Sequence, residues 1–314
     1  DLTGMIEEEG FYTPVKNRVI ADDQQIVRID HEKISSLCSW QESRLIALLP
    51  HLFEGIEIVA LSDYGKGFLT PTLLQAVIAY ANAKQIPVII DPKGFDYKKY
   101  AGANIVKPNL SETYAAAALE PEAGVEAAAR KILDTVDIQT LMVTRAAEGI
   151  SLFHADGKRE DFFVRAHEVK DVTGAGDTVL AMLTVALASG MTLSDATQLC
   201  NIAAGIAIEK VGCARVTIAQ LAQRLLELHG TNKVFSKDHQ FALQIALEGQ
   251  KFNILKLPHA DALTSDLYKS IKANVQGPDH RLIISLNNPN PDFVNILSSL
   301  QEVHSIILED YTEE

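Results

Sequence analysis

The chain has 314 residues, enough for one large domain or for two domains of ordinary size. With 47% hydrophobic and 22% charged residues, its composition is that of a soluble globular protein, and no apolar run approaches the length needed to cross a bilayer. The net charge of −13 argues against non-specific binding to nucleic acids, although it allows local basic pockets.

The three cysteines, Cys38, Cys200 and Cys213, are far apart and odd in number. They fit a reduced, cytoplasmic protein and provide no metal-ligand spacing. No signal peptide is visible. The first residues, Asp1-Leu2-Thr3, have the character of sequence from within a domain. We therefore expect either further sequence upstream or a naturally shortened relative.

The first predicted elements are two β-rich runs, at residues 18–20 and 25–29, which flank a turn at 21–23. The second run alternates, so one face is apolar and the other face carries Gln25 and Arg28. Such a hairpin is either a solvated ribbon, whose charges discourage edge-to-edge pairing, or part of a ligand site.

Helices and short apolar strands then alternate along the chain. The expected helices cover residues 41–49, 71–83, 124–134 and a segment from 111 onward, and the expected strands cover 56–61, 87–90, 104–106 and 140–143. This alternation predicts a parallel sheet with helices on both faces. In such sheets, ligands lie at the carboxyl ends of the strands.

Polar residues follow each of these strands directly. They are Asp63, then Asp91 and Lys93, then Asn109 and Glu112, then Thr144 and Arg145. Each also has a purely structural interpretation: Asp63 as a turn residue, Lys93 as a solvated charge, and Asn109 with Glu112 as ordinary helix-capping residues. Their coincidence at successive strand ends favours a ligand site over separate structural roles.

Two further strands, 150–153 and 161–164, lead to the stretch Asp171-Val172-Thr173-Gly174-Ala175-Gly176-Asp177. An apolar run at 178–189 follows and predicts a helix that stops at Gly190. Small residues at a helix start leave backbone N–H groups bare, and these groups, with the helix dipole, form an anion site.

A carboxylate beside an anion site repels phosphate, yet Asp177 is suited to take a proton from a hydroxyl that attacks phosphorus. The stretch therefore predicts phosphoryl transfer to an alcohol. The alternative is an ordinary glycine-rich helix cap, in which Asp177 only complements the helix dipole.

Residues 171–178 resemble the C-terminal signature of the ribokinase-like carbohydrate kinases. Further motifs follow the family's order at 24–30, 61–67, 91–94, 107–112 and 143–145. More narrowly, the chain from about residue 13 to 217 is similar to the kinase half of the bacterial bifunctional heptose-phosphate kinase/adenylyltransferases. The resemblance implies a ribokinase-like α/β fold: a mostly parallel sheet with helices on both faces and a small β lid.

The resemblance also implies roles for the residues that match the family's motifs. Asp177 is implied as the catalytic base, and the backbone amides of Gly174, Ala175 and Gly176 as the cradle for the transferred phosphoryl group. The residues implied in binding the sugar phosphate are Lys16, Arg18, Gln25, Arg28 and Asp63.

ATP is implied as the phosphoryl donor. The residues implied in contacting the nucleotide are Lys93, Asn109, Thr144, Gly149 and Asn201, the last on a helix expected to end near residue 210. The loop 144–149 departs from the family pattern, because Ala146 stands where the family usually has glycine.

Two cation sites are implied as well. Asn109 and Glu112 would organise Mg²⁺, largely through water, since this ion keeps several of its waters and needs only one or two carboxylates nearby. Asp171 and Thr173, with the loop 211–216, resemble the site that holds a monovalent cation such as K⁺ in many relatives.

We expect a kinase domain at 1–229, which includes a closing helix at 217–229, followed by a linker at 230–235 and a second domain at 236–314. In the second domain, expected helices at 239–247, 265–274 and 291–300 alternate with strands at 251–256, 281–285 and 305–308. This alternation is typical of a small Rossmann-like domain.

The bifunctional relatives carry an adenylyltransferase domain in this place, with a His-x-Gly-His turn. In the corresponding region, 256–262, only His259 is present. The resemblance therefore implies a shortened, degenerate nucleotidyltransferase-like domain. Relatives also carry sequence upstream of the part matched here, including a first core strand and a Gly-Gly segment that binds substrate.

The leading hypothesis is an ATP-dependent kinase that acts on a small-molecule sugar or sugar phosphate, with a heptose 7-phosphate, phosphorylated at its anomeric hydroxyl, favoured by the resemblance. The alternative is a catalytically inactive, kinase-like subunit or scaffold. Neither nucleic acid nor membrane is expected as a partner. Relatives often pair through their lids, so a homodimer is an additional hypothesis.

Overall fold

The computed structural model covers residues 1–314 and describes all of them except 1–2, 8–9, 22–23, 165–168, 211, 229–232, 236–242, 246, 259–261, 276, 278–279, 288 and 310–314. For residues 20, 24, 25, 226–228 and 309, only the backbone is described. The chain divides into two compact units, one formed by residues 1–166 and 174–204 and the other by 167–173 and 205–314.

The first unit is built on a sheet with the strand order β3-β4-β5-β6-β7-β8. Its parallel strands are β3 (Val59–Ser62), β4 (Val88–Asp91), β5 (Ile105–Val106) and β6 (Thr140–Thr144). The strands β7 (Ile150–His154) and β8 (Arg159–Phe162) continue the sheet antiparallel. The prediction of a mostly parallel sheet is therefore confirmed.

One expected strand is shorter than predicted. Residues 56–58 were expected in the strand at 56–61, but β3 begins only at Val59. The reason lies in the neighbouring strand: β4 begins at Val88, and the amide of Val59 donates to the carbonyl of Pro87 at 2.9 Å. Residues before Val59 therefore extend beyond the start of β4, where β4 offers them no partners for strand hydrogen bonds.

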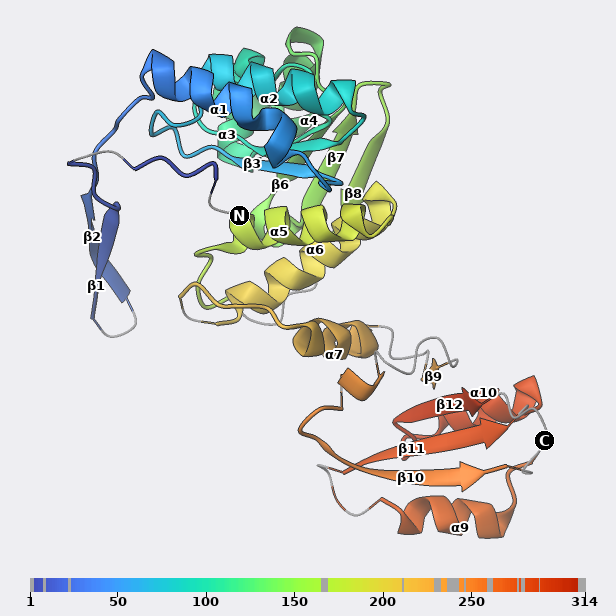
Figure 1. Ribbon diagram of the computed structural model, residues 1–314. Coiled ribbons are helices and arrows are strands. Elements are labelled where there is room, and N and C mark those ends of the chain that lie inside the picture. Colours follow the sequence, from blue (N-terminus) through green and yellow to red (C-terminus); the bar gives the residue numbers. More distant parts are fainter. Residues whose placement is uncertain are drawn as a thin grey trace. The chain divides into compact units, whose positions relative to one another are not determined.

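Helices cover both faces of this sheet (Figure 1). On one side lie α1 (Ser39–Leu52), α2 (Pro71–Ala83), α3 (Leu110–Ala117) and α4 (Val125–Thr135), and on the other lie α5 (Ala175–Ala188) and α6 (Leu193–Ile208). Short 3₁₀ turns are η1 (Tyr97–Tyr100), η2 (Pro121–Ala123) and η3 (Ala146–Glu148).

Successive residues of the central strands serve opposite faces, as strand geometry requires. Ile90 and Val106 pack with buried residues of α2 and α4, whereas Ile89 and Ile105 pack with α5 and α6. Helix α1 packs on α2, in a cluster that also includes Val59 and Leu61 of β3.

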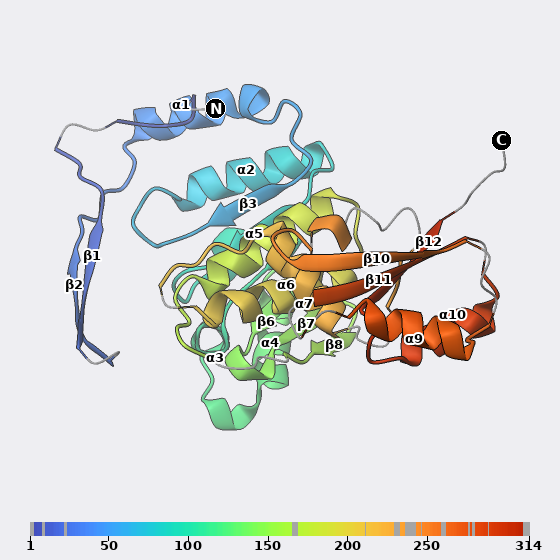
Figure 2. The same cartoon turned by 90° about the horizontal axis from the view of Figure 1, so that it is seen from below.

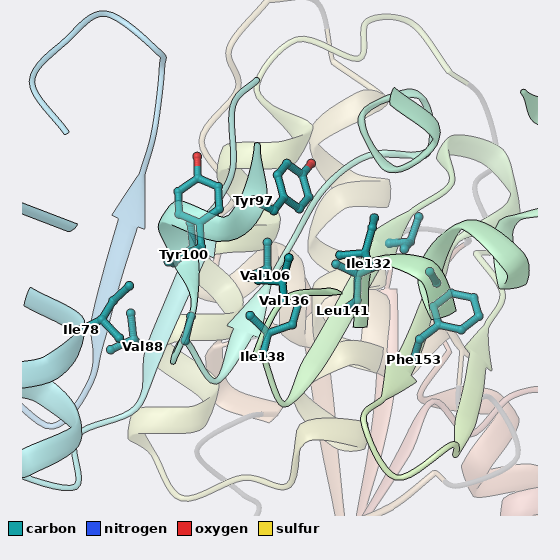
Figure 3. Packing of buried hydrophobic residues seen from close by; sticks show 14 of the residues in the cluster. Ile78, Val88, Tyr97, Tyr100, Val106, Ile132, Val136, Ile138, Leu141 and Phe153 are labelled. Carbon is teal, nitrogen blue, oxygen red and sulfur yellow. The ribbon is translucent and has the colours of Figure 1, made fainter. Parts of the chain in front are cut away.

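The cluster beneath α2 and α4 ends in two tyrosines of η1. Figure 3 shows Tyr97 and Tyr100 near each other, with both hydroxyls pointing away from the aliphatic side chains of the cluster. Their ring centroids are 5.7 Å apart and both residues are buried. Because a buried phenol needs a hydrogen-bond partner for its hydroxyl, we expect polar groups to lie next to this end of the cluster.

The expected lid is a separate antiparallel ribbon of β1 (Val15–Ala21) and β2 (Gln24–His31). The register pairs Val19 with Val27 and Arg18 with Arg28, with an irregularity between Val19 and Ile20. Since paired residues share a face, Lys16, Arg18 and Arg28 lie on one face and the valines on the other.

The second unit contains α7 (Ile218–Leu228) and a parallel sheet with the order β10-β11-β12-β9. The strands are β9 (Val234–Phe235), β10 (Lys251–Leu257), β11 (His280–Asn287) and β12 (Ser305–Glu309). Residues 234–235, expected in the linker, thus form a strand instead, because they pair with Ile306 and Ile307.

Helices α9 (Ser265–Ala273) and α10 (Pro291–Ser299) lie on the same side of this sheet (Figure 2). Their buried residues pack with Leu282, Ile284 and Leu286, while Ile283 packs on the opposite face with Leu243 and Leu247. The prediction of a small Rossmann-like second domain is confirmed. Among the described residues of the chain, no helix is long and apolar enough to cross a membrane.

Candidate active site

Helix α5 begins with bare backbone amides. Its N-cap, Gly174, has the left-handed φ of 80° and provides no side-chain cap. The first intrahelical bond runs from the amide of Thr178 to the carbonyl of Gly174, at 2.9 Å. The amides of Ala175, Gly176 and Asp177 therefore have no acceptor within the helix, as expected for an anion cradle.

Asp177 lies in the first turn of α5 and is exposed. The hydroxyl of Tyr64, from the loop after β3, donates to its Oδ1 at 3.2 Å. Burial raises the pKa of Tyr64, and the charge of Asp177 raises it further. The carboxylate thus stands open at the carboxyl end of β3, where the sequence placed the ligand site.

Two side chains of neighbouring strands form a buried ion pair next to this carboxylate. Asp91 ends β4 and Lys107 follows β5, and the register that pairs Ile90 with Val106 brings these two residues side by side. Nζ of Lys107 lies 3.0 Å from Oδ1 of Asp91, and the side chain of Lys107 is 3% exposed. Burial raises the pKa of Asp91, the ammonium of Lys107 opposes that rise, and the charges of Glu112 and Asp177 add to it.

Asn109 and Glu112 form a capping box at the start of α3. The side chain of Asn109 accepts from the amide of Glu112 at 2.9 Å, and Glu112 Oε2 accepts from the amide of Asn109 at 3.1 Å. The other oxygen, Oε1, accepts from Nζ of Lys93 at 2.7 Å. The structural interpretation of this pair is therefore correct, and it leaves the carboxylate of Glu112 facing the same group of charges as Asp91 and Asp177.

This set of groups fits a water-coordinated Mg²⁺ better than a directly held one. Among the described residues, no group of three or more His, Cys, Asp or Glu side chains is arranged to hold a metal ion. Asp91, Glu112 and Asp177 are nevertheless close enough for the last two to act on the pKa of the first. The buried hydroxyl of Tyr97 also feels the charges of Glu112 and Asp91 and has no hydrogen-bond partner within the described chain.

Asp63 is buried, with 7% of its surface exposed. Its Oδ1 accepts from the amide of Gly65 at 2.7 Å, and its Oδ2 accepts from Nζ of Lys99 at 2.7 Å and from the hydroxyl of Tyr100 at 2.6 Å. Burial alone would raise the pKa of Asp63, but these hydrogen bonds outweigh it and lower the pKa. Its contact with sugar stays a prediction, whereas its hold on the loop that carries Tyr64 is observed.

The expected nucleotide loop lies between β6 and β7. A parallel bridge joins Thr144 to Asn109, so these two predicted residues are neighbours. Ala146 has a φ of 50°, the left-handed conformation that favours glycine. The backbone therefore keeps the shape that a glycine at this position would favour, although the residue is alanine.

Gly149 and Asn201 meet at the end of β8. A Cβ added to Gly149 would lie 2.0 Å from the carbonyl oxygen of Phe162, and Gly149 has a φ of 88°. Nδ2 of Asn201 donates to that same oxygen at 2.7 Å, and Asn201 is 7% exposed. The structure thus gives both residues a packing role, and their contact with nucleotide stays a prediction.

The two segments expected to form the cation site are hydrogen-bonded to each other, and both belong to the second unit. Oδ1 of Asp171 accepts from the amide of Thr173, and its Oδ2 accepts from the amide of Gly212, each at 2.9 Å. Asp171 therefore contacts the loop after α6, and a cation at this place stays a prediction. Both carboxylate oxygens hold backbone amides, so a cation here would rely mainly on carbonyl oxygens.

The charged residues of the hairpin are exposed. Arg28 pairs with Asp30 of its own strand, with Nε and Oδ1 2.9 Å apart, and Lys16 and Arg18 share its face. The side chain of Gln25 lies outside the described residues, as does His259. An ion pair of Glu32 with Lys66 links the segment after β2 to the loop that carries Tyr64.

Sequence reasoning missed several residues that the structure places at the site. They are Tyr64, Tyr97, Lys99, Tyr100 and Lys107. Lys107 directly follows β5 and Tyr64 follows the end of β3 by two residues, each inside a motif, so position along the sheet could have identified them. Lys99 and the two tyrosines lie in η1, away from any recognised motif.

Comparison with known proteins decides the family. A model described as pfkB family carbohydrate kinase matches residues 20–219. The chain belongs to this family. The resemblance inferred from the motifs is therefore confirmed, as is the classification of the protein among the carbohydrate kinases.

Curated relatives of this pfkB family chain carry the name bifunctional protein HldE. The protein from Geobacter sulfurreducens is 44% identical over 232 residues, which are 73% of this chain and 47% of that protein. The one from Geobacter metallireducens is 46% identical over 223 residues, 70% of this chain and 46% of that protein. The chain thus spans about half the length of these relatives.

A third HldE relative, from Paramagnetospirillum magneticum, is 35% identical over 301 residues, covering 90% of this chain and 59% of that protein. This alignment is longer than the kinase match, since only 200 residues fall within 20–219. The similarity to HldE therefore extends into the second unit.

Solved structures confirm the ribokinase-like fold. The ribokinase of Giardia lamblia has a TM-score of 0.57 at 15% identity, over 70% of this chain and 73% of that chain. Phosphofructokinase-2 from Escherichia coli, in a complex with potassium, has a TM-score of 0.56 at 17% identity, over 65% of this chain and 67% of that chain. At these identities the likeness establishes the fold alone.

Proposed function

We propose that the protein uses ATP to phosphorylate a hydroxyl of a sugar phosphate. The observation that carries this proposal is the position of Asp177: an exposed carboxylate in the first turn of α5, beside bare amides and at the carboxyl end of β3. A carboxylate buried away from the strand ends would have been incompatible with a kinase. Membership of the pfkB family supports the same activity.

In the proposed step, Asp177 takes the proton of the acceptor hydroxyl as its oxygen attacks the γ-phosphorus of ATP. The new bond joins the sugar oxygen to phosphorus, and the bond from phosphorus to the β–γ bridging oxygen breaks, with ADP as the leaving group. The amides of Ala175 and Gly176 face the charge that develops on the transferred group.

The favoured substrate is D-glycero-D-manno-heptose 7-phosphate, converted to the 1,7-bisphosphate. Two observations support it: the similarity to HldE proteins over the kinase region, and the net basic face of the β1–β2 hairpin, where Lys16, Arg18 and Arg28 lie with one acidic residue, Asp30. A basic face suits the phosphate that the acceptor already carries. Asp63, Gln25 and Arg28 remain proposed contacts of the sugar.

Cation requirements follow from the donor groups present. We infer that Mg²⁺ lies near Glu112 and Asn109 through water, where it would neutralise charge on the triphosphate when bound. Lys93, Thr144, Gly149 and Asn201 stay proposed contacts of ATP. A K⁺ at the loop of Asp171 and Thr173 is supported by the potassium complex of the fold relative from Escherichia coli.

The remaining proposals concern the whole protein. We infer a cytoplasmic enzyme that forms homodimers through its hairpin, with a kinase domain at 1–229, a linker from residue 230 and a second domain whose sheet includes β9 at 234–235. The second domain is proposed to be a degenerate nucleotidyltransferase-like domain with a role in packing. Small-molecule sugar phosphates, rather than nucleic acids or membranes, are its proposed partners.

The decisive experiment changes Asp177 to Asn. We expect turnover of ATP with heptose 7-phosphate to fall by about 10²–10⁴-fold, because the general base is lost while the helix start keeps its shape. The matched control is Asp195→Asn, which alters an exposed aspartate in the first turn of α6 that bonds to Thr192.

The control should keep turnover within about threefold of the unaltered protein, as a surface change of this kind has little effect. A fall of less than about tenfold for Asp177→Asn would refute the assignment of the base. An unaltered protein that consumes no ATP with any sugar phosphate would instead support the inactive, scaffold interpretation.

A further inference from the structure

We infer that Lys107 is a further catalytic residue: its buried ammonium stabilises negative charge on the phosphoryl group held at the start of α5. This inference rests on the proposed kinase function and deepens it. It starts from the location of the side chain. Lys107 follows Ile105 by two residues, so its side chain shares the face of β5 that packs on α5 and α6.

The ammonium lies immediately beneath the anion cradle. A Cβ built on Gly176 would lie 3.6 Å from Nζ of Lys107, which is ordinary contact distance. Because Gly176 has no side chain, none of its own atoms stands between the ammonium and the backbone of the cradle. A positive charge and the bare amides of α5 thus act on the same small volume.

Burial makes this charge both costly and effective. The side chain of Lys107 is 3% exposed, and its ion-pair partner is Asp91, itself mostly buried with 21% of its side chain exposed. Buried ion pairs seldom add stability over apolar residues of similar volume, because removing two charges from water offsets their attraction. In such surroundings, however, an ammonium close to the transferring phosphoryl group stabilises its developing negative charge much more strongly than it would in water.

The charges around the pair point to the same role. Asp91, Glu112 and Asp177 place three carboxylates near the cradle, and Lys93 reaches Glu112 from a half-exposed position. An incoming triphosphate adds further negative charge there. Lys107 is the buried cation of this group, fixed between β4 and α5, so its position needs no rearrangement during the reaction.

The test must separate a catalytic role from one exerted only through Asp91. We would compare the intact protein with the variants Lys107→Met, Asp91→Asn and the double variant. For each, the affinities for ADP and for ADP with aluminium fluoride, a mimic of the transferring group, are measured with Mg²⁺ and heptose 7-phosphate present. The ratio of the two affinities reports stabilisation of the transition state.

We expect this ratio to fall by at least tenfold in Lys107→Met and in the double variant, and to stay within threefold in Asp91→Asn, which keeps the ammonium. The double variant also guards against misfolding, since it leaves no unpaired buried carboxylate. Recovery of the ratio in the double variant, or an equal fall in Asp91→Asn, would overturn the inference. A lack of preference for the mimic in the unaltered protein would count against the kinase function itself.

Discussion

At the scale of single residues, the structure separates an exposed carboxylate at a helix start from a buried carboxylate that holds a loop in place. Asp177 is exposed beside bare amides. Asp63 is instead buried, and its two carboxylate oxygens accept hydrogen bonds from Gly65, Lys99 and Tyr100. Asp63 therefore fixes the turn that presents Tyr64 to Asp177. The observed role of Asp63 is to hold this loop, and this role is separate from its proposed contact with the sugar.

This role of Asp63 predicts a pH-dependent contribution to stability. The pKa of Asp63 is lower in the folded protein than in the unfolded chain, so the unfolded chain takes up the proton first as the pH falls. The carboxylate therefore stabilises the fold above the ordinary pKa of aspartate. That contribution is lost as the pH falls from about 4 toward the lowered value.

The corresponding variant is Asp63→Asn, with Asp137→Asn, an exposed aspartate, as control. Urea unfolding can be followed by the fluorescence of Trp40, the single tryptophan, which lies in α1 of the first unit. We expect Asp63→Asn to lower the free energy of unfolding by about 1–3 kcal/mol at neutral pH and by less at about pH 3. If the loss in the free energy of unfolding caused by Asp63→Asn did not change with pH, the stabilising role of the Asp63 carboxylate would be contradicted.

At the scale of elements, the loop between β6 and β7 keeps a backbone conformation that favours glycine, although one of its residues is alanine. Ala146 replaces the family's usual glycine but keeps a φ of 50°, and Gly149 has a φ of 88° with no room for a side chain. The two positions differ in what surrounds them. Around Gly149 the carbonyl of Phe162 fills the space, so only glycine fits there.

Two reciprocal substitutions in this loop should therefore act in opposite directions. Ala146→Gly should raise the free energy of unfolding by about 0.5–1 kcal/mol, since relief of the left-handed backbone exceeds the entropy that glycine adds to the unfolded chain. Gly149→Ala should lower it by at least about 2 kcal/mol, because the new Cβ meets a carbonyl oxygen. The fluorescence of Trp40 during urea unfolding measures both, and a near-neutral Gly149→Ala would contradict the described packing.

At the scale of the whole molecule, the hairpin presents a mostly apolar and exposed face. Val15, Val19, Val27 and Ile29 share this face, with exposed fractions from 45% to 56%. Contiguous exposed apolar side chains commonly mark an interface. We therefore expect the face to be covered in solution by a second copy of the chain.

Sedimentation velocity can test that expectation. Val27→Lys places a charge on the apolar face and should convert a dimer to a monomer, whereas Lys16→Ala on the opposite face should leave the dimer intact. An unaltered protein that sediments as a monomer would refute the homodimer. So would a Val27→Lys variant that stays dimeric.

Local signals explain which elements could be predicted from the sequence. Helix α2 was predicted with the bounds observed, because Thr70 caps it by accepting from the amide of Leu73 and Pro71 opens its first turn. The start of β3 was predicted too early, because it depends on where β4 begins and not on the apolar character of residues 56–58.

The contacts within the site could not be predicted in the same way. Asp63 meets partners 36 and 37 positions away, and Asp171 meets Gly212 across 41 positions. No local pattern encodes such pairs; only the parallel sheet and a family's motifs bring them together. Even for Lys107, which lies inside a recognised motif, the sequence does not predict the ion pair with Asp91 on the neighbouring strand.

The hydrogen bond between Tyr64 and Asp177 spans 113 positions of the chain. During translation, the ribosome would release β3 and β4 well before α5 exists, and domains begin to fold while synthesis continues. A nascent chain could therefore form most of its sheet and still lack Asp177, the proposed base. Under the proposed mechanism, products of interrupted synthesis would contain folded strands without Asp177 and would therefore be inactive.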